Sequence, residues 1–187
     1  MRLSLSEAQQ EEMRHAYRDG APGVLVSGIV WIVAAVVSHF LDIHRGVWTL
    51  IIGGALISPM SAMLTKATGR PGRAKGNSLN QLAMASTIWL ILCCAMAYGL
   101  FLLKPVFFFP VMMGTIGCRY LVFASVFGRS IFWVIGASLI VAGYIAYFWA
   151  LVPAASAAFG GLIEILFATV LLSQAVRDAN PTAGQQT

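Results

Sequence analysis

The sequence predicts an all-α integral membrane protein, a bundle of six transmembrane helices built as three antiparallel hairpins. Composition is the first observation: 59% of the 187 residues are hydrophobic and only 10% are charged, whereas soluble domains carry about 25% charged residues. The second observation is a set of six apolar segments, each of roughly the 20 residues that a helix needs to cross a bilayer. The third is the placement of Lys and Arg, which predicts how the chain is threaded.

The polar and apolar stretches divide the chain into three regions. Residues 1–20 are polar and are expected to form a cytoplasmic helix, in which Ser6 and Gln9 fit a capping box. The alternative is that this helix binds a partner or acts as a sensor at the membrane interface. Residues 21–176 are expected to form the six-span domain, and residues 177–187 a cytoplasmic disordered tail.

The six spans follow from hydropathy and from the turn residues between them. Short turns join the first span to the second, the third to the fourth and the fifth to the sixth, which predicts the hairpins. The expected ranges are 21–40, 46–65, 79–103, 106–127, 130–151 and 155–176. Trp31 and Trp89 lie deep in their spans and are expected to pack between helices.

Basic residues predict a multi-pass protein of the bacterial inner membrane with both termini in the cytoplasm, because Lys and Arg concentrate on the cytoplasmic side. Only Arg45 and Lys104 fall on the outer side in this orientation. The inner side holds Arg2, Arg14, Arg18, Lys66, Arg70, Arg73, Lys75, Arg129 and Arg177. We expect Lys66, Arg70, Arg73 and Lys75, in the loop between the second and third spans, to attract anionic lipid loosely.

One charged pair is the main functional hypothesis. Arg119 lies well inside the fourth span, and its guanidinium keeps its proton, so it needs a partner. Glu164 lies inside the sixth span on a stripe of small residues that favours close helix packing, so it is expected to point into the bundle. We expect the two side chains to meet directly or through one water. The competing interpretation is an Arg119 that reaches toward the headgroups and a protonated Glu164.

Further polar residues fall near this pair. Thr115 lies one turn from Arg119, while Thr87 and Tyr98 lie near one face of the third span. They are expected either to line a ligand or ion pocket around Arg119 and Glu164, or to make hydrogen bonds between helices. Two prolines are expected to interrupt helices: Pro59 as a kink in the second span and Pro110 near the start of the fourth.

Short motifs resemble an uncharacterised family of small polytopic bacterial inner-membrane proteins, a domain of unknown function. They are Gly28-Ile29-Val30-Trp31, Ser58-Pro59, Phe109-Pro110, Gly117-Cys118-Arg119-Tyr120-Leu121 and Phe127-Gly128. Arg119 stands where that pattern has a histidine. The resemblance implies a polytopic membrane fold and brings no activity with it.

The sequence favours the binding or transport of a small solute or ion through a polar pocket inside the membrane. The alternative is a structural or signalling membrane protein without a transport path, and a membrane-embedded enzyme is third. The sequence contains no HExxH or GxSxG motif. No catalytic residue, metal ligand set, cofactor or nucleic-acid partner is therefore expected.

Overall fold

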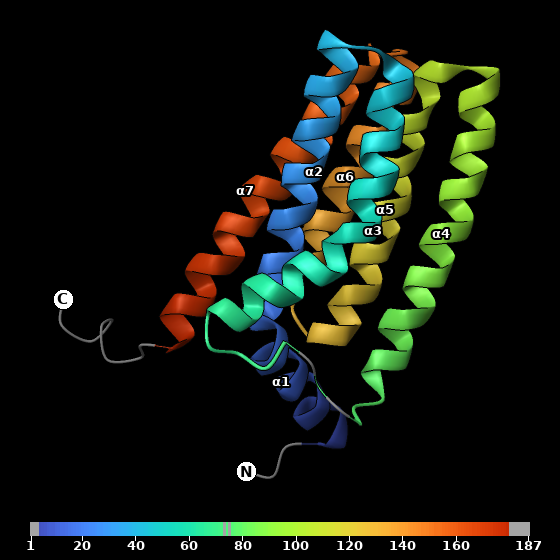
Figure 1. Ribbon diagram of the computed structural model, residues 1–187. Coiled ribbons are helices and arrows are strands. Elements are labelled where there is room, and N and C mark those ends of the chain that lie inside the picture. Colours follow the sequence, from blue (N-terminus) through green and yellow to red (C-terminus); the bar gives the residue numbers. More distant parts are fainter. Residues whose placement is uncertain (1–3, 73, 75, 180–187) are drawn as a thin grey trace.

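The computed structural model describes residues 4–179 apart from residues 73 and 75, and all of its described regular elements are helices. Six of them are long and apolar enough to cross a membrane, which confirms the predicted fold class (Figure 1). The elements are α1 (Leu5–Tyr17), η1 (Arg18–Gly20), α2 (Ala21–Phe40), α3 (Ile43–Ala67), α4 (Leu79–Leu103), η2 (Pro105–Phe107), α5 (Phe108–Phe127), α6 (Ile131–Phe148) and α7 (Pro153–Ala179).

The helix ends agree with the predicted spans to within a few residues. α2 and α4 have the predicted limits, while α3 is longer at both ends. It begins earlier because Asp42 caps it by accepting a hydrogen bond from the Arg45 backbone N–H at 2.8 Å. α7 continues to Ala179, beyond the predicted end of the sixth span. The rest of the predicted tail, residues 180–187, lies outside the described residues.

Glycines hold the two closest helix pairs together. A Cβ atom on Gly28 of α2 would lie 3.1 Å from the Gly161 carbonyl oxygen of α7, and one on Gly117 of α5 would lie 2.8 Å from the Gly136 carbonyl oxygen of α6. Backbones can approach this closely only where side chains are absent, and such contacts drive helix association in lipid. Glycine-mediated crossings therefore bring α2 against α7 and α5 against α6.

The two prolines behave differently. Pro59 lies inside α3, whose second half turns away from the direction of its first half in Figure 1. This bend agrees with the predicted kink, since proline removes a helical hydrogen bond and crowds the preceding turn. Pro110 lies in the first turn of α5, just after η2, where a proline is tolerated.

α1 is bound to one end of the bundle, here called the α1 end. Its N-cap is Ser4, which forms a capping box with Glu7; the predicted box at Ser6 and Gln9 is therefore wrong by two residues. Two side chains of α1 bind the last carbonyls of α5: Gln10 donates to Ser125 O at 2.8 Å and Arg14 to Phe127 O at 2.8 Å. These bonds satisfy carbonyls that the end of a helix leaves without helical partners.

A candidate polar site inside the bundle

Arg119 binds α4. Its Nη2 donates a hydrogen bond to Thr87 Oγ1 at 3.0 Å, and its guanidinium carbon lies 5.0 Å from the centre of the Phe123 ring, one turn along α5. Both Arg119 and Thr87 lie about 12 Å from the α1 end of their helices, at the rise of 1.5 Å per residue. A charged side chain thus joins α4 to α5 well inside the apolar length of both helices.

Glu164 binds a different side of α5. It is fully buried, and the Tyr120 hydroxyl donates a hydrogen bond to Glu164 Oε1 at 2.8 Å. Ser27 of α2 is buried close to both groups. A carboxyl group, a phenol and a serine from three helices therefore meet in the core.

Arg119 and Glu164 do not form the direct ion pair expected from the sequence, since the ion pairs among the described residues do not include them. The reason lies in α5, where Arg119 and its neighbour Tyr120 point about 100° apart. Tyr120 faces Glu164, so Arg119 is turned toward α4. A contact through one water stays a prediction.

The other predicted pocket residues lie apart from this site or bind locally. Thr115 donates to the Val111 carbonyl of its own helix at 2.9 Å. Tyr98 is about 16 Å from Thr87 along α4 and packs against the rings of Trp48 and Phe101. Of the predicted pocket residues, the structure joins Arg119 to Thr87, and it places Glu164 beside Tyr120.

Among the described residues, four buried polar atoms on α2 and α7 lack a hydrogen-bond partner: Trp31 Nε1, Ser38 Oγ, Ser156 Oγ and Glu164 Oε2. Ser156, Gly160 and Glu164 are spaced by four residues and share one stripe of α7. The Trp31 ring lies against this stripe, because a Cβ atom on Gly160 would be 3.1 Å from it. This stripe runs from Glu164, near the middle of α7, to Ser156, near the N-terminal end of α7, which is the end opposite α1.

The predicted site residues did not include Tyr120, Ser27 or Ser156. A signal was present for two of them: Ser27 is four residues before the buried Trp31, and Ser156 is eight residues before Glu164, so each shares a helix face with a predicted interior residue. Tyr120 gave no such signal, because an aromatic residue beside Arg119 is equally compatible with a lipid-facing position.

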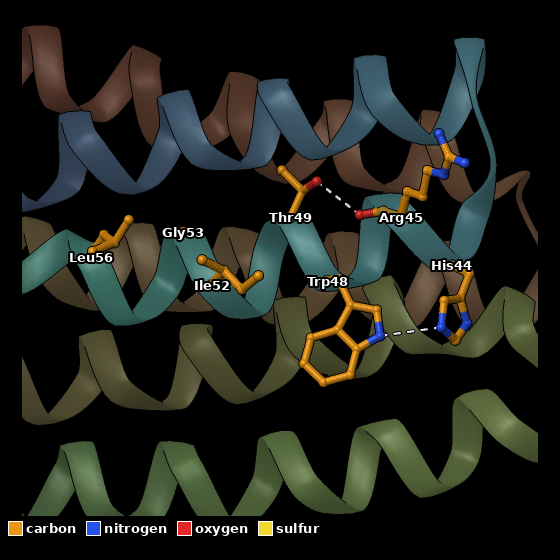
Figure 2. Close-up of a pocket in the computed structure, with 7 residues that line it drawn as sticks. All are labelled: His44, Arg45, Trp48, Thr49, Ile52, Gly53 and Leu56. Carbon is orange, nitrogen blue, oxygen red and sulfur yellow. Dashed lines mark hydrogen bonds between the residues drawn. The ribbon is translucent and has the colours of Figure 1, made fainter.

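A shallow groove of about 470 Å³ lies elsewhere, along one face of α3 (Figure 2). Trp48 donates from Nε1 to His44 Nε2 at 3.2 Å there, and the rest of the lining is mainly apolar, including the exposed Ile52 and Leu56. All of its lining residues come from one helix. A shallow, mainly apolar groove on one helix is typical of a surface that faces lipid. It contains none of the predicted site residues.

Comparison with known proteins gives a family but no activity. The profile of the "Family of unknown function (DUF7010)" matches residues 6–174, from α1 into α7. No curated protein and no solved structure matches the chain. The expected resemblance to an uncharacterised family is thereby confirmed.

Proposed function

Since the chain belongs to this family of unknown function, we propose from its geometry that the bundle binds and transports a small ion, and that the ion is a proton carried by Glu164. The observation that supports this most is the buried carboxyl group of Glu164, which has one oxygen bound to Tyr120 and the other without a hydrogen-bond partner in the described part of the chain. The second oxygen can take part in one further hydrogen bond.

The surroundings favour the neutral acid over the carboxylate. A charge at the centre of a membrane helix costs about 2.5 kcal/mol or more, and no ion pair with a described cation compensates Glu164. A carboxylic acid exchanges its proton when water or another polar group reaches it. Trp31 Nε1 and Ser156 Oγ supply unpartnered polar atoms along the side of α7 that leads to the end opposite α1.

Arg119 adds a fixed positive charge near this site. It stays protonated and is bound to a neutral hydroxyl and an aromatic ring. A fixed positive charge on the other side of α5 disfavours the entry of metal cations by Coulomb repulsion. A proton meets the same repulsion, so the assignment to a proton rests on the Glu164 carboxyl group.

The alternative is a structural role, and the two interhelical hydrogen bonds favour it. The bond between Arg119 and Thr87 ties α4 to α5, and the bond between Tyr120 and Glu164 ties α5 to α7. Buried polar pairs of this kind stabilise membrane bundles in the absence of any transport. The two candidate functions differ in whether protons reach Glu164.

A flux measurement separates them. The purified protein is reconstituted into liposomes that enclose a pH-sensitive dye, and a potassium diffusion potential drives proton entry. We expect flux above that of empty liposomes, loss of that flux with Glu164→Gln, and partial flux with Tyr120→Phe. The control is Glu7→Gln, the same exchange at an exposed position outside the spans.

Thermal melting and gel filtration establish that each variant is folded before its flux is compared. Wild-type flux equal to that of empty liposomes contradicts the proposal and favours the structural role. The same conclusion follows if folded Glu164→Gln transports protons as fast as the wild type.

A further inference from the structure

A second polar site lies at the α1 end, outside the spans and independent of Glu164. It is a cavity of about 690 Å³ between the end of α1, η1, the turn after α3, the turn before α6 and the last turns of α7. Its lining is mostly polar. The charged side chains in the lining are Glu11, Arg14, Arg18, Asp19, Arg70 and Arg129.

Two of the four arginines are bound to acidic side chains. Arg14 pairs with Glu11 and also donates to the Phe127 carbonyl of α5. Arg129 pairs with Asp19, with 3.1 Å between Nε and Oδ1. These pairs fix the position of the cavity walls and largely balance their own charge.

Arg18 and Arg70 are not balanced in this way. Neither side chain has an ion pair or hydrogen bond within the part of the chain that the structure describes. The backbone nevertheless fixes both positions: Arg18 ends α1 with a left-handed φ of 50°, and the Arg70 N–H donates to Thr65 O at 3.3 Å. The Gly72 N–H binds Ala16 O at 2.9 Å, which holds the turn of Arg70 against α1.

We propose that this cavity binds a phosphate group through Arg18 and Arg70. The planar guanidinium matches phosphate oxygens in a two-bond geometry, which makes arginine the usual residue for such recognition. The volume lies within the range of small-molecule sites. Ala175 and Val176 of α7 form part of the wall, so the phosphate can come from a lipid headgroup with its chains along α7 or from a free phosphate.

This site differs from the loose attraction of anionic lipid expected for Lys66, Arg70, Arg73 and Lys75. Of those four cations only Arg70 lines the cavity; Arg73 and Lys75 lie outside the described residues. Lys66 is exposed at the same end of the bundle but is not part of the lining. A general electrostatic surface uses all cations alike, whereas a cavity depends on those that line it.

The experiment measures lipid retained by the full chain in detergent, using native mass spectrometry with equal amounts of phosphatidic acid and phosphatidylcholine. The variants are Arg18→Gln, Arg70→Gln and the pair together, with Lys66→Gln as the matched loss of one charge. We expect the wild type to retain more phosphatidic acid than phosphatidylcholine. Arg18→Gln and Arg70→Gln should each retain about fivefold less phosphatidic acid than the wild type, and Lys66→Gln should retain as much as the wild type. The double variant Arg18→Lys with Arg70→Lys keeps both charges and should weaken binding less than the glutamine pair.

Inorganic phosphate, added in the same experiment, identifies the source. Displacement of phosphatidic acid by phosphate at comparable concentration indicates a free phosphate ligand, and weak displacement indicates a lipid headgroup. Either result supports the site. The proposal is overturned if folded Arg70→Gln and the double glutamine variant bind as the wild type does, or if Lys66→Gln loses as much as Arg70→Gln. Arg70 has no described side-chain bond, so its variant should fold.

Discussion

Arg119 and Tyr120 are neighbours in α5, yet they bind different helices, α4 and α7. Arg119 donates to Thr87 of α4, and Tyr120 donates to Glu164 of α7. The helical angle of about 100° between neighbouring residues sends the two side chains to different partners. α5 thereby carries two polar contacts at one depth, one toward the edge helix α4 and one toward the core.

Thr87→Val should lower the melting temperature in detergent by removing the acceptor of the Arg119 hydrogen bond. α4 packs chiefly against α5, and a hydrogen bond to a charged group contributes about 1.5–3 kcal/mol. Thr169→Val is the matched control, because the Thr169 hydroxyl is exposed and binds the Leu166 carbonyl of its own helix. Equal melting temperatures for the two variants would show that the Arg119 contact does not hold α4.

Double-mutant cycles should rank the polar contacts. We expect Tyr120→Phe and Glu164→Leu to be coupled by about 0.5–3 kcal/mol, the range for side chains in direct contact. Arg119→Met and Glu164→Leu should be coupled more weakly, because these two side chains form no direct ion pair. The readout is the melting temperature of each single and double variant. Stronger coupling of Arg119 than of Tyr120 to Glu164 would restore the pair expected from the sequence.

Gly161→Leu should destabilise the bundle at the crossing of α2 and α7. A Cβ atom at this position already lies 2.8 Å from Ile32 Cδ1 and 3.0 Å from the Gly28 carbonyl oxygen, and overpacking costs about 1–3 kcal/mol. Gly54→Leu provides the comparison, because nothing lies within 4 Å of its Cβ position. The measurement is thermal stability in detergent, and equal stability of the two variants would contradict the glycine crossing.

Acidification should loosen the first turn of α1. The hydrogen bond from the Ser4 backbone N–H lowers the pKa of Glu7. The capping energy is therefore fully present above the unfolded-state pKa of Glu7 and is lost as the pH falls through its folded-state value. Amide hydrogen exchange at Glu7 and Ala8 measures this. Glu7→Gln keeps a capping box without titrating. The protection of these amides from exchange in Glu7→Gln, relative to that in the wild type, should therefore rise as the pH falls.

The sequence was sufficient for the spans and insufficient for the contacts between them. Hydropathy placed α2 and α4 correctly, because lipid requires an unbroken apolar helix whatever its neighbours are. The same pattern predicted that Trp31 and Trp89 are both packed between helices. Trp31 is fully buried, whereas Trp89 is 59% exposed because α4 lies at the edge of the bundle.

The candidate site shows the same limit. Because charged residues are rare in the spans, Arg119 and Glu164 could be identified as candidates from the sequence. The small residues of α7 correctly indicated that Glu164 is buried. Their partners depend on the rotation of α5 about its axis, which decides that Tyr120 meets Glu164 and that Arg119 meets Thr87. Rotation follows from glycine crossings such as Gly117 with Gly136, and a single sequence does not specify which glycines face each other.

The most direct test is whether solution protons reach Glu164. Infrared spectra of the reconstituted protein, compared between the wild type and Glu164→Gln, isolate the carbonyl stretch of the Glu164 carboxylic acid. This band should be present in the wild type, absent from the variant, and shifted when H₂O is replaced by D₂O. A band that is missing from the wild type, or that keeps its position after prolonged exchange into D₂O, would contradict proton transfer through Glu164.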